Sequence, residues 1–89
     1  MTQAVFAEAL RDYCQALDAS VTSYGRTRAH NAKVGGFETS RHLHWLAADV
    51  VYDEQMPIST RNALAAQLGL TVLHEDDHDH LQPAPGATL

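Results

Sequence analysis

The sequence has little cysteine, few basic residues and no long apolar run, and each shortage excludes a class of protein. Its single cysteine, Cys14, cannot form an internal disulfide and lies on the apolar face of an expected helix, which favours a buried thiol. Six lysine and arginine residues stand against eleven aspartate and glutamate residues. The resulting formal net charge of −5 repels a phosphate backbone, so we expect no nucleic-acid partner.

The N-terminal segment, residues 1–10, lacks the features of a targeting or anchoring sequence. It has no cationic start, and it contains Glu8 within its apolar stretch. A secretory signal needs a cationic start, and a membrane anchor needs a much longer uncharged run. We therefore expect a chain that is made in the cytoplasm and has no membrane partner.

The composition that remains is typical of one small folded domain. Apolar residues make up 45% and charged residues 19% of the 89 residues, which is unlike a disordered chain. One domain is expected, because independent folds have about 50–250 residues. A chain of this size buries only about 60–65% of the surface that its unfolded form exposes. Its stability margin is therefore narrow, and a bound metal or a partner would add to it.

Hydrophobic spacing near the N-terminus predicts an amphipathic helix. Phe6, Leu10, Tyr13 and Leu17 are separated by four, three and four residues, which places them on one helical face. Thr2 precedes this pattern and is a suitable N-cap, because its hydroxyl can accept a hydrogen bond from a free backbone N–H group. We expect this helix to pack its apolar face on the core.

The rest of the chain reads as short strands and helices, followed by a tail. The expected elements are a strand at 20–24, a short helix or turn at 27–34, a central strand at 46–52, a helix from the N-cap Ser59 to Gly69, and a hairpin of strands at 70–73 and 78–82. Residues 83–89, with two prolines and a glycine, are expected to be a disordered tail beyond a single domain at 1–82. This order predicts an α+β fold, a small antiparallel sheet with helices packed on it.

Two clusters of polar residues combine imidazole with carboxylate, one at 40–49 and one at 74–80. Neutral imidazole and carboxylate are ligands that Zn²⁺ accepts, and a catalytic zinc site uses three protein ligands with a fourth position open. A three-ligand site would need donors from both clusters. The spacing alone also allows a simpler interpretation, in which the second cluster is a solvated, acidic, histidine-rich hairpin.

The intervals within the clusters constrain how the side chains can meet. His78 and His80 are two residues apart and share one face of a strand. His42 and Asp49 are seven apart, so one straight strand cannot present both on the same side. A bend between His42 and Asp49 is therefore expected if both contribute to one site.

The amino-acid sequence of four segments, in this order along the chain, resembles that of the M15 peptidases, the zinc D-Ala-D-Ala carboxypeptidases and related cell-wall endopeptidases. These segments are 24–27, 30–36, 40–51 and 77–81. Their most specific part is a Ser-x-His-x6-Asp motif followed by a distal His-x-His pair. The resemblance covers about residues 20–82 and implies the fold that these peptidases share with the hedgehog signalling domain.

Carried over residue by residue, the resemblance implies a zinc site made of His42, Asp49 and His80. Two departures from the family pattern bear on this site. Trp45 stands three residues after His42, where the family usually has glycine, so a requirement for positive φ there would be costly to meet. The order Tyr24-Gly25-Arg26 also inverts the usual Gly-Tyr order.

The resemblance further implies four catalytic residues. Asp77 stands three residues before His80, at the position of the family's catalytic carboxylate, and Glu75 is the substitute if the hairpin has another register. Arg26 lies near the family's substrate-binding arginine. His78 corresponds to a histidine that faces the site without binding the metal.

The function expected from these residues is zinc-dependent hydrolysis of peptidoglycan peptides that contain D-amino acids, by a D-Ala-D-Ala carboxypeptidase or an endolysin-type endopeptidase. Such an enzyme would reach the cell wall by a phage-type release route. One alternative is a catalytically silent zinc-binding domain that holds a wall peptide or serves as a phage accessory module. Another is a metal-free interaction module with an acidic hairpin.

Overall fold

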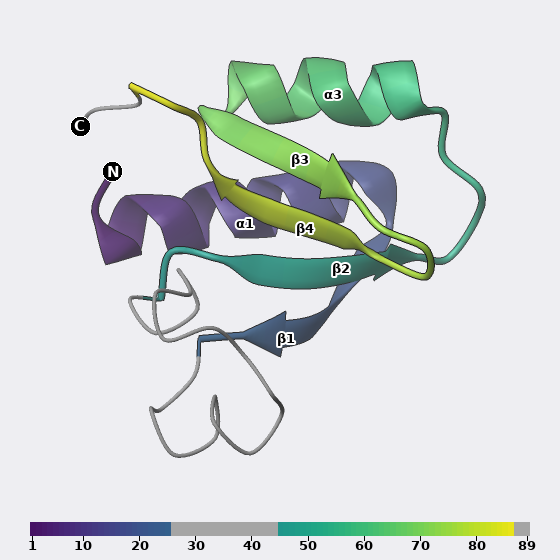
Figure 1. The fold of residues 1–89 in the computed structure, drawn as a ribbon, viewed down its shortest axis with the longest axis horizontal. Helices are drawn as coiled ribbons and strands as arrows, with labels where there is room; N and C mark the ends of the chain where they lie inside the picture. Colours follow the sequence, from purple (N-terminus) through teal and green to yellow (C-terminus); the bar gives the residue numbers. More distant parts are fainter. Residues whose placement is uncertain (26–44, 87–89) are drawn as a thin grey trace.

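The structure, a computed structural model, describes residues 1–25 and 45–86. The elements run in the order α1, β1, β2, α3, β3 and β4 (Figure 1). The short helix or turn expected at 27–34 lies outside the described residues, as do Arg26 and His42.

Helix α1 (Gln3–Leu17) matches the helix that the apolar spacing predicts. Its buried residues are Phe6, Ala9, Leu10, Tyr13 and Leu17. The predicted N-cap is confirmed, because the Thr2 hydroxyl accepts a hydrogen bond of 3.1 Å from the Val5 backbone N–H. The C-cap residue Asp18 follows the helix and has a left-handed conformation with φ of 49°.

Four strands form one antiparallel sheet in the order β1-β2-β4-β3. They are β1 (Ala19–Tyr24), β2 (Ala48–Tyr52), β3 (Leu70–His74) and β4 (Asp79–Pro83). β2 lies between β1 and β4, as its dense Ala and Val content predicts for a central strand. The predicted hairpin is confirmed, because β3 pairs with β4.

Helix α3 (Ile58–Gln67) begins earlier than its expected cap. Ser59 lies inside the helix, so its prediction as the N-cap is wrong, and Pro57 takes that position without a side-chain hydrogen bond. Proline suits this place because its ring fixes φ, here −57°, near the helical value. Gly69 follows the last turn with φ of 75°, which confirms its prediction as the terminating residue.

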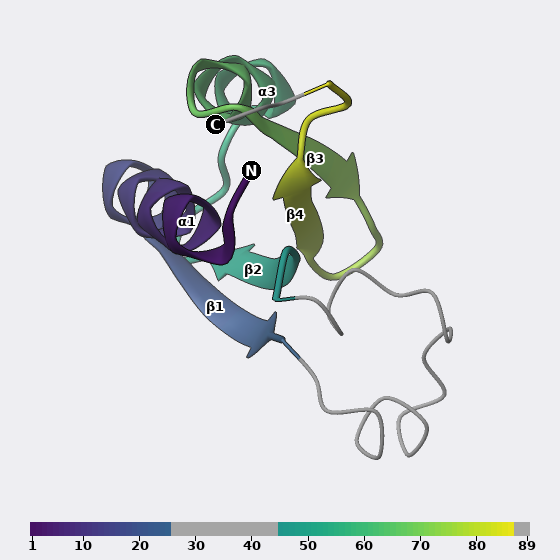
Figure 2. The same ribbon diagram turned by 90° about the vertical axis from the view of Figure 1, so that its left-hand side faces the viewer.

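Both helices cover the same face of the sheet (Figure 2). The core lies between them and consists of small and large apolar side chains from every layer: Phe6, Ala9, Leu10, Tyr13, Leu17, Ala48, Val50, Ala65, Leu70 and Leu81. The fold is therefore the α+β arrangement that the order of elements predicts. No helix among residues 1–25 and 45–86 is long and apolar enough to cross a membrane.

The end of β4 departs from the sequence prediction. Pro83, expected in the tail, is the last residue of the strand and pairs with Leu70. The next residue, Ala84, donates its backbone N–H to the carbonyl of Gly69 at 2.9 Å. The start of β3 therefore holds the chain through residue 84.

Candidate functional site

Two of the predicted metal ligands face each other on the side of the sheet that the helices leave uncovered. Asp49 on β2 and His80 on β4 are direct partners in the antiparallel register. Side chains at such positions lie close together on one face. The Nδ1 atom of His80 is 3.2 Å from Oδ1 of Asp49.

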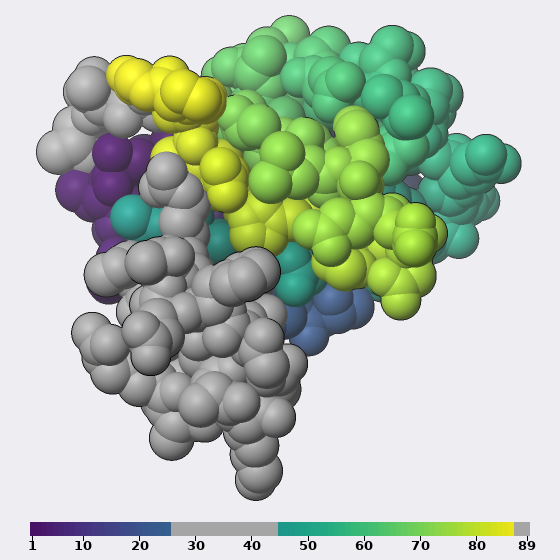
Figure 3. Space-filling model, in the orientation of Figure 1, coloured from purple at the N-terminus to yellow at the C-terminus, as the bar shows by residue number. Residues whose placement is uncertain are grey.

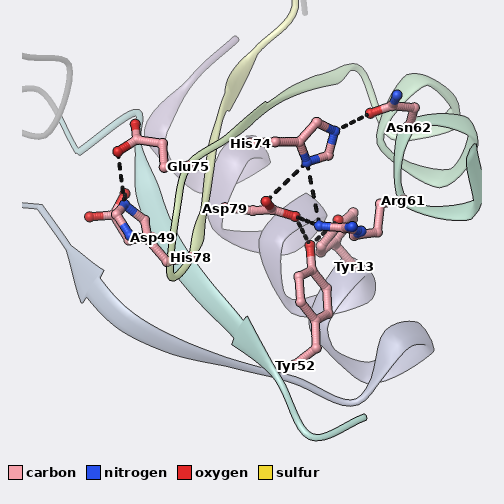
Figure 4. A network of polar contacts seen from close by, with 9 residues as sticks. All are labelled: Tyr13, Asp49, Tyr52, Arg61, Asn62, His74, Glu75, His78 and Asp79. Carbon is pink, nitrogen blue, oxygen red and sulfur yellow. Dashed lines mark hydrogen bonds and ion pairs between the residues drawn. The ribbon is translucent and has the colours of Figure 1, made fainter. Parts of the chain in front are cut away.

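His78, just before β4, lies beside this pair. Its Nε2 atom is 3.8 Å from Oδ1 of Asp49 and 3.3 Å from Oε2 of Glu75 (Figure 4). Its Nδ1 atom is 2.7 Å from Oδ1 of Asp77. The hydrogen bond with Asp77 raises the pKa of His78 against the opposing effect of burial, and the charges of Asp49 and Glu75 add to the rise.

The two candidate catalytic carboxylates lie on different edges of the His78 ring. Glu75 is at the Nε2 edge, which also faces Asp49. Asp77 is at the Nδ1 edge, and 91% of its side chain is exposed. The hydrogen bond from His78 lowers the pKa of Asp77, so this carboxylate is ionised at neutral pH.

Gln82 is a polar contact of the site that sequence reasoning missed. Its Oε1 atom is 3.0 Å from Nε2 of His80, the ring nitrogen that does not face Asp49. Residues 80 and 82 share one face of β4, because side chains alternate along a strand. That period of two is the signal that could have placed Gln82 beside His80.

The distance between Asp49 and His80 is suitable for two ligands of one zinc ion. Ligands at about 2.0–2.2 Å in a tetrahedral site are roughly 3.3–3.6 Å apart, slightly more than the 3.2 Å that separates Nδ1 of His80 from Oδ1 of Asp49. Among the residues that the structure describes, no group of three or more His, Cys, Asp or Glu side chains could hold a metal ion. The third expected ligand, His42, lies outside them.

A second polar group occupies the opposite, helix-covered face of the sheet (Figure 4). At its centre is Asp79, whose side chain is only 3% exposed. Its Oδ2 atom is 2.6 Å from Nη1 of Arg61 and accepts a hydrogen bond of 2.6 Å from the Tyr52 hydroxyl. Its Oδ1 atom is 3.0 Å from Nδ1 of His74. Burial opposes ionisation of Asp79, but these three partners together lower its pKa.

This buried network extends into both helices. The Tyr52 hydroxyl is 2.6 Å from that of Tyr13 on α1. His74 reaches α3 through its Nε2 atom, 3.0 Å from Oδ1 of Asn62. Burial raises the pKa of Tyr13, and burial together with the hydrogen bond to Asp79 raises that of Tyr52. The network therefore ties β2, β3 and β4 to the two helices that cover them.

The network was not anticipated from the sequence, which places Asp79 only in the expected strand at 78–82 and in the polar cluster at 74–80. The alternation of a strand predicts that Asp79 faces away from its neighbours His78 and His80. The partners from α3 and β2 depend on how these elements pack.

An open hollow of about 470 Å³ lies between the β3–β4 turn and the segment that leads into α3. Its lining includes residues 51–56 and 74–79. The two segments lie at the molecular surface at the right of Figure 3, in yellow-green and teal. The turn that carries Glu75 and Asp77 is therefore accessible from solvent.

The comparison with protein families decides the assignment. A model of the family described as Peptidase M15 matches residues 2–82. The chain belongs to the peptidase M15 family. This confirms the resemblance that the motifs at 40–51 and 77–81 indicate. No curated protein and no solved structure matches the chain.

Trp45 stands where M15 sequences usually have glycine, and the structure shows how it is accommodated. Its φ is 59°, so the backbone does adopt the left-handed conformation that favours glycine. The indole ring packs edge-on against Tyr24, with ring centroids 5.4 Å apart. It also covers Gly25, where an added Cβ would overlap the ring. This packing brings together the two residues that flank the segment 26–44.

Membership of the M15 family makes peptide hydrolysis the class of activity to consider for this chain. Within the described part of the chain, the motifs single out candidate metal ligands and candidate catalytic residues, and the structure brings both kinds together. Asp49, His78 and His80 lie together on the sheet face opposite the helices, with Glu75 and Asp77 at the ring of His78.

Proposed function

We propose that this protein is a zinc-dependent peptidase that hydrolyses peptidoglycan peptides containing D-amino acids. The observation that carries the proposal is the 3.2 Å approach of His80 to Asp49, two ligand positions of the family motif, from different strands. The substrate class comes from the resemblance to cell-wall peptidases of the M15 family. Such an enzyme would act on the wall after a phage-type release.

Asp49 and His80 would hold the zinc ion together with His42. When bound, zinc would supply Lewis acidity, which polarises a peptide carbonyl and makes water a nucleophile at neutral pH. Asp49 contributes a negative charge and His80 a neutral nitrogen, a donor set that zinc accepts. The protein must provide these donors deprotonated, so zinc affinity should fall in mildly acidic buffer.

Asp77 would act as the general base that takes a proton from the attacking water and passes it to the leaving amine. A positioned acid–base group typically contributes about 10²–10⁴-fold to the rate. Its lowered pKa keeps the carboxylate in the ionised form, the form that a base requires. Glu75 is the alternative base, since it lies at the edge of the His78 ring that faces Asp49.

His78 would stabilise the negative charge that develops on the carbonyl oxygen. The pKa of its ring is raised by the hydrogen bond with Asp77, which favours the cationic form. Arg26 is the second candidate for this role, from its place in the family motif. Removing one such donor from a catalytic site costs roughly 3–4 kcal/mol of transition-state stabilisation.

A direct test combines metal analysis with an assay of hydrolysis. The purified full chain is expected to contain about one zinc ion per molecule and to cleave purified peptidoglycan or a peptide ending in D-Ala-D-Ala. A chelator should abolish turnover, and added zinc should restore it. Absence of zinc and of turnover would reject the proposal.

A second function, a silent zinc-binding domain that holds a wall peptide, is favoured by one feature. Trp45 stands three residues after His42, where the family usually has glycine, and 44% of the surface of this residue is exposed. Such a ring can cover part of a binding groove. Stoichiometric zinc with wall binding but no hydrolysis would select this function over the peptidase.

A further inference from the structure

We infer that Gln82 is a positioning residue that sets the tautomer and orientation of His80 for metal binding. The inference rests on the proposed zinc function and deepens it. Gln82 acts on the side of the imidazole ring opposite Asp49, with its Oε1 atom 3.0 Å from Nε2 of His80.

The argument begins with the two nitrogens of a neutral imidazole. One of them carries a hydrogen and donates, and the other has a lone pair and accepts. The carbonyl oxygen of an amide can only accept, so Nε2 of His80 must donate to Gln82. In a ring that binds a metal ion the lone pair is therefore on Nδ1, the atom that lies 3.2 Å from Oδ1 of Asp49. Without the ion, the carboxylate accepts a hydrogen from Nδ1 at that distance.

The tautomer with its lone pair on Nδ1 is the one that a shared metal ion requires. A cation next to Asp49 would be bound by the lone pair of Nδ1, whereas the other tautomer would present an N–H group there. Histidines that bind metals nearly always donate their second N–H to an oxygen acceptor, which fixes the ring and raises its basicity. Gln82 provides that acceptor for His80.

The strand geometry gives this contact its precision. The side chains of residues 80 and 82 share one face of β4. The backbone of β4 is held between β2 and β3 by the hydrogen bonds of the sheet. The neighbouring residue Asp79 is anchored on the opposite face by Tyr52 and Arg61. The backbone that carries both His80 and Gln82 is therefore fixed from two sides.

The decisive experiment compares zinc affinity in three variants by competition with a chromophoric chelator. Gln82→Met keeps the length of the side chain and removes the acceptor, so we expect a 10- to 100-fold weaker affinity, the usual effect of losing such a contact. Gln82→Glu keeps an acceptor and adds charge, so its affinity should equal or exceed that of the wild type. Gln67→Met is the matched control, because this glutamine is exposed on α3, and it should bind zinc as the wild type does.

A spectroscopic measurement separates positioning from a general effect on folding. Long-range ¹H–¹⁵N spectra of the zinc-loaded wild type should show His80 protonated at Nε2 and metal-bound through Nδ1. In Gln82→Met, the His80 signals should broaden or report a mixture of ring states, while circular dichroism of the metal-free protein stays that of the wild type. If Gln82→Met is unfolded without metal, Gln82→Leu takes its place, and the same spectra are compared with those of Gln82→Glu.

The outcomes distinguish this inference from the proposed function on which it rests. If the wild type binds zinc and Gln82→Met binds it equally well, Gln82 has no positioning role and the zinc function stands. Binding through Nε2 in the wild type would also overturn the inference alone. If the wild type binds no zinc at all, both the proposed function and the inference are wrong.

Discussion

His80 and Asp79 are consecutive residues of β4 whose side chains serve opposite faces of the sheet. His80 meets Asp49 on the face opposite the helices, and Asp79 is buried with Arg61 and Tyr52 beneath the helices. The alternation of side chains along a strand makes this division unavoidable. The anchoring of one residue therefore fixes the position of the other, and the stability of the network bears directly on the geometry of the candidate metal site.

The first prediction concerns Asp49. Asp49→Asn keeps the shape of the side chain but removes its charge, so zinc should bind far more weakly. For the wild type, a zinc concentration 100 times the Kd should add about 2.7 kcal/mol to the free energy of unfolding. This corresponds to a rise in Tm on the order of 10 °C for a domain of this size. Differential scanning fluorimetry with zinc and with chelator should show this rise in the wild type and little of it in Asp49→Asn.

The control for Asp49 is Asp12→Asn, which changes an exposed carboxylate on α1. This variant should keep the full response to zinc. An equal response in Asp49→Asn and in the wild type would remove Asp49 from the ligand set.

The second prediction concerns the buried partner of Arg61. Asp79→Ala leaves the guanidinium of Arg61 without its carboxylate, 2.6 Å away in the native protein. Breaking a buried ion pair by removing one partner typically costs about 3–5 kcal/mol. Urea unfolding of the metal-free protein should show a loss of this size, whereas Asp12→Ala, at an exposed pair, should change stability by about 0.5 kcal/mol or less. A loss in Asp79→Ala no greater than in that control would mean that the network contributes little to stability.

How far the sequence predicts this molecule differs between the fold and the site. The spacing of apolar residues was enough to predict α1, the central strand β2 and the β3–β4 hairpin. They were not enough for the start of α3, where the fixed φ of Pro57 outweighs the capping tendency of Ser59. Local patterns of this kind report the elements and leave their pairing open.

The site depends on that pairing. Asp49 and His80 are 31 residues apart, and only the register of β2 against β4 makes them neighbours. Periodicity could not provide this register, so the motif resemblance was needed to connect the two. Asp79 and Arg61 illustrate the same limit, since their contact depends on the packing of α3 over the sheet, for which no motif was available.

The third prediction separates the two candidate bases. Asp77→Asn should lower kcat by about 10²–10⁴-fold with little change in KM, because it removes the proton acceptor and leaves a neutral amide oxygen beside His78. Glu75→Gln should have a smaller effect on kcat. Steady-state hydrolysis of a defined wall peptide by zinc-loaded protein measures both, with Asp76→Asn in the same turn as the control. A larger loss in Glu75→Gln than in Asp77→Asn would assign the base to Glu75.

The fourth prediction concerns stability in alkaline solution. Burial raises the pKa of Tyr13, and burial with the hydrogen bond to Asp79 raises that of Tyr52, so both phenols keep their protons in the folded protein. In the unfolded chain they ionise near about pH 10. The unfolded state then binds fewer protons than the native state, so the free energy of unfolding falls as the pH rises above about 10. Each phenol contributes a slope of up to about 1.4 kcal/mol per pH unit. Chemical unfolding of chelator-treated protein between pH 8 and 11 should show this fall, and Tyr13→Phe, which removes one of the two phenols, should make it less steep. A pH dependence equally steep in Tyr13→Phe would show that the Tyr13 phenol ionises alike in both states.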